Sequence, residues 1–295
     1  MLRPFAIHQP ATVAEAASLM REFGDEAAFY AGGTELLIVL KEHLASVDHL
    51  IDIKRIPGLN EISLGADGAT LMIGALATHR AVERDPLVRR YLPALAALEA
   101  KVANVRVRAA GTLGGNLCFA DPHSDPATLL SALGATLTLD NGDARRSVRA
   151  DAFTTDLMTT DREPDEVLTQ IAIALPGDAA GIGYERVKLH ERPTASAAAV
   201  IGVDNGLIAN ARVYVGCVGD APQRLRDVEG ALLGLPAIAT SSEQVKAAIA
   251  SLVVTYDTPF ESAPYKRQLA SAVGARAIAA AILDATKALE ARNVA

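Results

Sequence analysis

Residues 109–125 read AAGTLGGNLCFADPHSD and contain three glycines within five positions, Gly111, Gly114 and Gly115. A second glycine pair stands much earlier, in AGGTE at residues 31–35. Glycine lets the backbone adopt a positive φ and lets a ligand approach without meeting a Cβ atom. Successive backbone N–H groups in such turns bind anions. Either turn alone is most often only a tight turn, but the two together, each with a threonine hydroxyl, predict a site for a diphosphate.

The elements around the first turn predict a parallel β-α-β unit. A strand is expected near 27–31, a helix from about Thr34 and a second strand over 49–53. The helix would add its N-terminal N–H groups to the anion site. Before this unit, residues 12–23 have helical spacing, with Thr12 as the N-cap and Gly24 as the end.

The rest of the chain predicts an α+β protein. Asp67-Gly68 joins two alternating runs as a hairpin, and helices follow over 78–84 and 87–103, the second broken or kinked at Pro93. A helix capped by Ser124 or Asp125 leads to strand 135–139, and another strand covers 166–175. Beyond a boundary near 176–180, an antiparallel meander turns at 204–206 and precedes an alanine-rich helical tail.

Composition excludes several classes of protein. The formal net charge is −7, which argues against nucleic-acid binding because phosphate backbones are bound mainly by clustered Lys and Arg. Two cysteines cannot build an iron–sulfur cluster or a disulfide framework. The stretch MLRPFAIHQP lacks the long apolar region typical of a signal peptide, and no uninterrupted apolar run reaches the roughly 18 residues of a membrane span. A cytoplasmic protein is expected. P-loop, Rossmann and zinc-protease motifs are absent.

Three motifs in order carry a family resemblance. AGGTEL at 31–36, GTLGGN at 111–116 and ADPHSD at 120–125 resemble the FAD-binding medium subunit of the molybdenum hydroxylases, the carbon monoxide dehydrogenase and xanthine dehydrogenase type enzymes. The resemblance covers essentially the whole chain, because GCVGDAPQRLRDVEGAL and the stretch from Thr258 also fit the family's C-terminal part. It implies a flavoprotein of the vanillyl-alcohol-oxidase-like fold.

The resemblance also implies a domain organisation. We expect a PCMH-type FAD-binding domain over 1–177, with subdomains of about 1–55 and 56–177. A C-terminal domain like that of the CO dehydrogenase flavoprotein, a small antiparallel sheet plus helices, would follow over 178–295.

By resemblance, both glycine loops would wrap FAD, mainly its pyrophosphate and adjoining sugar, and Asp125 would accept hydrogen bonds from FAD hydroxyls. Glu35 departs from the Asp, Asn or Ser common in the first loop, and its carboxylate could cap the helix instead. Thr78 could reach FAD or cap the next helix, and capping is favoured. No catalytic residue and no metal ligand is expected in this chain. The expected cofactor-binding residues are Ala31, Gly32, Gly33, Thr34, Glu35, Leu36, Thr78, Arg108, Gly111, Thr112, Leu113, Gly114, Gly115, Asn116, Ala120, Asp125 and Lys188.

The family's organisation implies partners. A large subunit would hold the molybdenum cofactor, a small subunit would hold two [2Fe–2S] clusters, and FAD in this chain would pass electrons to an external acceptor. The complex would be a dimer of heterotrimers without nucleic acid or a membrane span. Two alternatives stay open: a stand-alone flavoenzyme of the same fold, MurB-like or an oxidase, and a scaffold subunit that has lost FAD. The sequence does not indicate the organic substrate or the electron acceptor.

Several other side chains have simpler interpretations. Cys118 is expected to be a packing residue. The acidic run at 161–166 and the basic run at 145–149 are expected to be solvated surface charge. His123 is expected to face solvent, and whether His123 or His190 contacts the flavin stays open.

Overall fold

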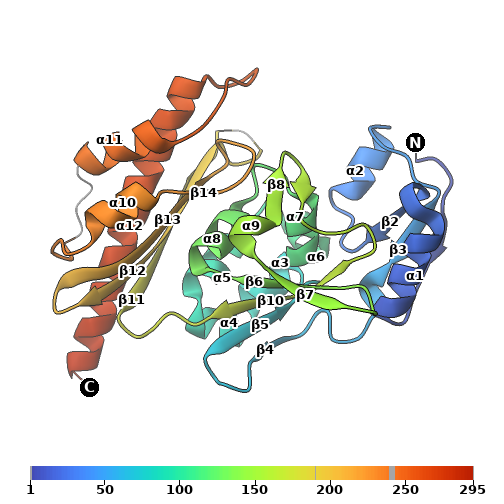
Figure 1. Ribbon diagram of the computed structural model, residues 1–295, viewed down its shortest axis with the longest axis horizontal. Coiled ribbons are helices and arrows are strands. Elements are labelled where there is room, and N and C mark those ends of the chain that lie inside the picture. Colours follow the sequence, from blue (N-terminus) through green and yellow to red (C-terminus); the bar gives the residue numbers. More distant parts are fainter. Residues whose placement is uncertain (1, 190, 239–242, 295) are drawn as a thin grey trace. The chain divides into compact units, whose positions relative to one another are not determined.

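The computed structural model of the chain describes residues 2–189, 191–238 and 243–294 (Figure 1). The chain folds into two compact units. The first comprises Met1–Phe119, Thr136–Thr155 and Thr159–Ile173, and the second comprises Ala120–Ala135, Asp156–Met158 and Ala174–Ala295. The domain boundary expected near 177 stays a prediction.

The first unit begins with a small parallel sheet in the order β1-β3-β2 (Figure 1). Thr12 caps α1 by accepting a hydrogen bond from the Glu15 backbone N–H, and Glu15 returns one to the Ala11 N–H, as in a capping box. The parallel pairing of β2 with β3 confirms the expected β-α-β unit, although the helix after the first loop begins at Leu36 rather than Thr34. The elements are β1 (Ala6–His8), α1 (Val13–Phe23), η1 (Gly24–Glu26), β2 (Ala27–Tyr30), α2 (Leu36–Lys41), β3 (His49–Asp52) and η2 (Ile53–Arg55).

A five-stranded sheet in the order β4-β5-β10-β6-β7 forms the rest of the first unit's framework. The hairpin at Asp67-Gly68 is confirmed, with Gly68 at φ 63° between β4 and β5. Strand β7 was not predicted, because its sequence RRSVR gives no apolar alternation. The strands are β4 (Ile62–Leu64), β5 (Thr70–Gly74), β6 (Thr136–Asp140), β7 (Arg145–Arg149) and β10 (Val167–Ala174), with a separate pair β8 (Thr154–Asp156) and β9 (Thr159–Thr160).

Short helices cover this sheet and connect to the second glycine motif. Pro93 ends one helix and begins the next, so the break expected inside 87–103 is confirmed. Two further helices follow: α6, which was not predicted, and α7, which lies where the sequence predicted a turn. The helices are α3 (His79–Arg84), α4 (Pro86–Tyr91), α5 (Pro93–Glu99), α6 (Val105–Ala110), α7 (Leu113–Phe119) and α9 (Ala150–Phe153).

The second unit is an antiparallel sheet with helices on both faces. Ser196 on β12 hydrogen-bonds Thr128 of α8, while its neighbours Ala195 and Ala197 belong to the core cluster that includes α12. Because successive strand residues face opposite sides, α8 and α12 cover opposite faces of the sheet. The elements are α8 (Asp125–Leu133), β11 (Ala180–Val187), β12 (Ala195–Asp204), β13 (Leu207–Gly216), β14 (Gln223–Arg224), α10 (Arg226–Leu232), α11 (Glu243–Leu252) and α12 (Ala263–Val294).

The alanine-rich helix α12 owes its composition to close packing. A Cβ atom at Gly183 of β11 would lie 1.9 Å from the Ala277 carbonyl oxygen, and one at Gly181 would lie 2.1 Å from that of Ala281. Both alanines are fully buried. Small residues on strand and helix thus let the two backbones approach, which is a packing reason beyond the helix propensity of alanine.

One helix among the described residues, α12 over Ala263–Glu290, could cross a membrane by its length and composition. Of its most apolar window, 56% is buried inside the protein, as in a core helix. The expectation of no membrane span stays a prediction.

Candidate functional site

A cavity of about 780 Å³ lies within the first unit. This volume falls within the roughly 300–1,000 Å³ typical of sites for small molecules and cofactors. Three stretches distant in sequence contribute to its walls: the first glycine loop, the second glycine motif, and residues 162–168; residues of α1, β2 and the segments 75–79 and 102–107 also line it. The first two were predicted as site residues, and the third was not.

The first glycine loop follows the end of β2. All six expected residues from Ala31 to Leu36 line the cavity. Gly33 has φ 70°, a left-handed conformation that glycine adopts without strain. Lys54, which does not line the cavity, donates a 3.4 Å hydrogen bond from Nζ to the Ala31 carbonyl oxygen, lies 3.7 Å from the centre of the Tyr30 ring and pairs with Asp52. Glu35 lines the cavity and its side chain does not cap α2.

The second glycine motif is a helix start and not the expected tight turn. Thr112 Oγ1 accepts a 3.0 Å hydrogen bond from the Gly115 N–H, and α7 begins at Leu113. Gly114 and Gly115 therefore lie in the first helical turn, without positive φ. The sequence did not predict this helix because Gly114 and Gly115 have low helix propensity. Thr112, Gly114, Gly115 and Asn116 line the cavity.

The two motifs touch each other. A Cβ atom at Gly32 would lie 2.3 Å from the Ala110 carbonyl oxygen and 2.7 Å from Gly111 Cα. One at Gly111 would lie 3.1 Å from Thr34 Oγ1. Gly32 therefore permits a backbone-to-backbone approach of the two motifs, and Gly111 leaves room for the Thr34 hydroxyl. The structure places the two loops side by side on one cavity.

Four expected residues of the first unit do not line the cavity, and their contact with FAD stays a prediction. Thr78 Oγ1 caps α3 by accepting from the Ala81 N–H, which confirms the favoured interpretation. Arg108 Nη1 donates to the Val102 carbonyl oxygen, and Leu113 is fully buried. Gly111 packs against the first loop as described.

The other three expected residues belong to the second unit. Ala120 is buried at φ 51°, and Lys188 is exposed. Asp125 is buried, accepts a hydrogen bond from the Tyr184 hydroxyl and forms an ion pair with Arg186. Burial raises the pKa of Asp125, although Tyr184 and Arg186 oppose that shift. Ser124 is the N-cap of α8. Both carboxylate oxygens of Asp125 thus have partners within this unit.

Sequence reasoning missed a buried pair behind the second loop. His79 Nδ1 lies 2.6 Å from Glu99 Oε2, and both side chains are almost completely buried. The His79 backbone N–H donates to the Gly111 carbonyl oxygen, and His79 also lines the cavity. The pair joins α3 to α5, so it holds the chain that carries Gly111. A glutamate in an otherwise apolar helix, Glu99, was the sequence feature that could have indicated this buried pair.

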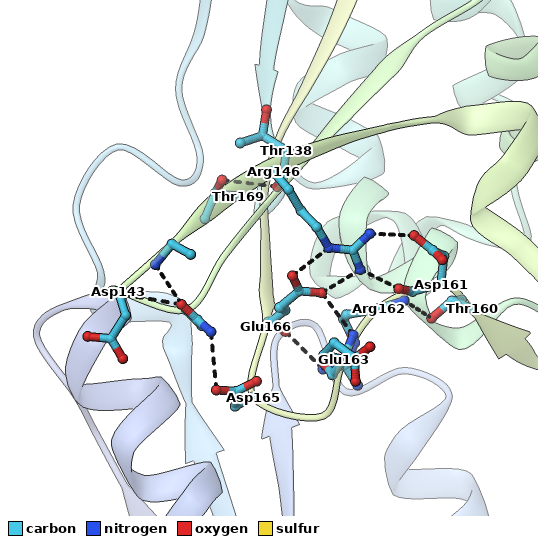
Figure 2. A network of polar contacts seen from close by, with 12 residues as sticks. Thr138, Asp143, Arg146, Thr160, Asp161, Arg162, Glu163, Asp165, Glu166 and Thr169 are labelled. Atoms are coloured by element: carbon cyan, nitrogen blue, oxygen red, sulfur yellow. Dashed lines mark hydrogen bonds and ion pairs between the residues drawn. The ribbon is translucent and has the colours of Figure 1, made fainter.

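The third wall was also missed. Arg146 on β7 donates to Glu166 Oε1 from Nε at 2.7 Å and pairs with Asp161 as well (Figure 2). Glu166 is buried, so the interpretation of 161–166 as a solvated acidic turn is wrong for this residue, whereas Asp161 and Glu163 are exposed as expected. Arg162 Nη1 donates to three carbonyl oxygens of the same segment. The acidic run is a folded wall built around two arginines, which we call the 162–168 wall.

Cys118 and His123, the other side chains considered in the sequence analysis, have structural roles. Cys118 lines the cavity, and burial raises the pKa of its thiol to about 11, which keeps it protonated and agrees with a packing role. The His123 backbone N–H donates to Asp121 Oδ1, and its ring is half-buried with a pKa lowered by burial and by Lys266. The expectation that His123 faces solvent is therefore wrong. His190 lies outside the described residues.

Acid should loosen the 162–168 wall. Burial acts to raise the pKa of Glu166, but hydrogen bonds from Arg146 and from the Glu163 backbone N–H outweigh it, so this pKa is lowered. A lowered carboxylate pKa stabilises the fold above the ordinary value of 4.5 and loses its contribution as the pH falls through the lowered pKa. We expect the thermal midpoint to fall along that acid limb, and Glu166→Gln to flatten the limb. The exposed Glu163→Gln is the control; equal profiles for wild type and Glu166→Gln would contradict this.

Comparison with known proteins identifies the family. Residues 3–176 match the FAD binding domain in molybdopterin dehydrogenase, and residues 188–281 match the CO dehydrogenase flavoprotein C-terminal domain. The carbon monoxide dehydrogenase medium chain of Hydrogenophaga pseudoflava is 33% identical over 283 residues, which are 94% of this chain and 96% of that protein. The caffeine dehydrogenase subunit beta of a Pseudomonas species is 29% identical over 92% of this chain and 93% of its own.

Solved structures agree with this assignment. A structure of carbon monoxide dehydrogenase from Hydrogenophaga pseudoflava matches with a TM-score of 0.90 and 31% identity, over 96% of this chain and 99% of that one. Quinoline 2-oxidoreductase from Pseudomonas putida 86 matches with a TM-score of 0.88 and 27% identity, over 98% of this chain and 99% of its own. The α+β fold with a C-terminal sheet-and-helix domain is thereby confirmed. The chain belongs to the family of FAD-binding domains of molybdopterin dehydrogenases.

Proposed function

We propose that the chain is the FAD-carrying electron-transfer subunit of a heterotrimeric molybdenum hydroxylase. The observation that carries this is the meeting of both glycine motifs on one cavity of cofactor size. Relatives named carbon monoxide dehydrogenase medium chain, caffeine dehydrogenase subunit beta and nicotinate dehydrogenase FAD-subunit support it.

The cavity fits the chemistry of FAD. Backbone N–H groups and the hydroxyls of Thr34 and Thr112 are donors suited to a diphosphate, and the motif glycines that line the cavity, Gly32, Gly33, Gly114 and Gly115, leave the backbone open there. Apolar side chains such as Phe29, Leu36 and Val107 line the rest and would exclude water from a flat aromatic ring. The residues that we assign to FAD in the first unit are Ala31–Leu36, Thr112 and Gly114–Asn116. Contact of Asp125 and Lys188 with FAD stays a prediction from the family resemblance.

The chain's own residues bind, orient and shield the cofactor. When bound, FAD supplies the redox chemistry, taking electrons from [2Fe–2S] clusters of a small subunit and delivering them to an external acceptor. The two cysteines of the sequence are too few for the four thiolates of such a cluster, so the clusters belong on a partner. A large subunit would hold the molybdenum cofactor, in a cytoplasmic dimer of heterotrimers. This chain then needs no acid or base for the organic substrate.

Visible spectra test the proposal. The full chain is purified alone and together with the subunits that co-purify with it. We expect flavin absorption bands in the preparation, and broad iron–sulfur absorption only in the complex. A colourless protein that takes up no FAD in either form would overturn the proposal. Flavin in a lone chain that turns over an organic substrate unaided would favour a stand-alone flavoenzyme.

A further inference from the structure

The diphosphate of FAD brings negative charge to a cavity whose glycine loops offer no cationic side chain. Residues 31–36 and 111–116 contain no Lys or Arg, and they contribute the carboxylate of Glu35. The protein as a whole carries a formal charge of −7. Only uncharged donors, the backbone N–H groups and two threonine hydroxyls, would face the phosphates, whereas phosphate sites commonly add a basic side chain.

Two arginines lie among the described residues that line the cavity, and no lysine does. Arg21 is committed to carboxylates, with Nη1 at 2.7 Å from Asp165 Oδ2. Arg162 forms no ion pair within the described chain. Its Nη1 donates to the carbonyl oxygens of Glu163, Pro164 and Glu166 at 2.9, 2.9 and 2.8 Å. These three bonds use one nitrogen, so the rest of the guanidinium remains available as a donor.

Arg162 lies close to the roots of both glycine motifs. Its guanidinium carbon is 5.7 Å from the centre of the Phe29 ring, and Phe29 lies two residues before Ala31 on the strand that enters the first loop. The charge of Arg162 also acts on Cys118, which lies on α7 three residues after Gly115. The guanidinium thus lies beside Phe29 and acts electrostatically on Cys118, and all three residues line the cavity.

We infer that Arg162 binds the diphosphate of FAD from the 162–168 wall, as a third contact beside the two glycine loops. The inference rests on the proposed function and adds a cationic ligand to it. A guanidinium held by one nitrogen can present its other N–H groups to phosphate oxygens in a planar fork.

The wall is built to hold this arginine. Glu166, whose carbonyl oxygen is one of the three acceptors of Arg162, is fixed from its side chain by Arg146 on the five-stranded sheet (Figure 2). Asp165, one residue before it, is fixed by Arg21 of α1 and by Asn141. The segment is thus tied to the parallel sheet's helix and to the five-stranded sheet. Arg146 acts as a positioning residue, since it reaches the cavity only through Glu166.

The test compares three probes on the FAD-free complex: FAD, ADP and riboflavin. ADP carries the diphosphate without the flavin, and riboflavin carries the flavin without the diphosphate. We expect Arg162→Gln to weaken FAD and ADP by roughly 10- to 100-fold, the cost of hydrogen bonds to a charged group, and to leave riboflavin unchanged. Arg162→Lys should recover most of the ADP affinity because it keeps the charge. The matched control is Arg106→Gln, an exposed arginine outside the cavity lining.

Four results would contradict the inference about Arg162 or the proposed function, and they can be told apart. An equal loss for riboflavin and ADP, with a lower thermal midpoint of the FAD-free protein, would show that Arg162 only shapes the wall. Unchanged ADP affinity in Arg162→Gln would also overturn the inference. If the wild-type complex binds riboflavin and FAD but not ADP, the diphosphate site is absent while the proposed function stands. A wild-type complex that binds no FAD at all would instead remove the proposed function.

Discussion

Replacing Gly32 with alanine should sharply weaken FAD binding, because the new Cβ atom meets backbone and not a movable side chain. It would lie 2.3 Å from the Ala110 carbonyl oxygen and 2.7 Å from Gly111 Cα, distances that only a shift of one loop can relieve. Overpacking of this kind costs about 1–3 kcal/mol, and here the displaced segments are the ones proposed to hold the diphosphate. We expect the Kd for FAD to rise roughly 10- to 100-fold in titrations of the FAD-free complex.

Gly230→Ala is the matched control for Gly32→Ala. Gly230 lies in α10, and a Cβ atom there would meet nothing within 4 Å. This variant should bind FAD like the wild type and should be no less stable, since alanine is the better helix former. Wild-type FAD affinity in Gly32→Ala would show that the contact between the two loops is not needed for the site.

Replacing Asp125 with alanine should destabilise the second unit even when no FAD is bound. Asp125 is 4% exposed, and its two oxygens meet the Tyr184 hydroxyl and Arg186. Removing one partner of a buried, hydrogen-bonded ion pair typically costs about 3–5 kcal/mol. We expect a loss of that order in the free energy of unfolding of the FAD-free chain, followed by urea denaturation and circular dichroism.

Asp125→Asn separates the two roles assigned to Asp125. The amide keeps the shape and can still accept a hydrogen bond from Tyr184, but it loses the charge that faces Arg186. Its loss of stability should be smaller than that of Asp125→Ala. If both variants unfold like the wild type without FAD, and only their FAD affinity falls, then Asp125 serves the cofactor alone and the structural role is wrong.

Local chemistry made much of the fold predictable. The N-cap Thr12 and the end at Gly24 fix helix α1, and Asp67-Gly68 fixes a hairpin, because each signal lies within a few residues of the element that it governs. The cap at Ser124 could be read for the same reason. The glycine motifs identified two of the three walls, since anion binding by backbone groups has a sequence signature.

The 162–168 wall could not be predicted because it depends on the ion pair between Arg146 and Glu166, which are 20 residues apart in the sequence. Arg146 lies in the run RRSVR, and Glu166 lies in a run rich in acids, so each looks like surface charge in its own neighbourhood. Only the antiparallel pairing of β6 with β7 and of β6 with β10 brings the two together. The helix start at Leu113 was hidden for another reason, since Gly114 must approach Ala75, and that contact outweighs its low helix propensity.

The assignment of α8 to the second unit limits how this protein can be divided. Helix α8 covers the face of the sheet opposite α12, yet it stands in the chain before strands β6 and β10 of the first unit. A truncation after residue 177 would leave α8 on the wrong fragment, and the complementary piece would expose β12 and β13 to water. Chimeras between family members should therefore exchange residues 120–135 together with the C-terminal segment, so that the sheet of the second unit keeps the helix that packs on it.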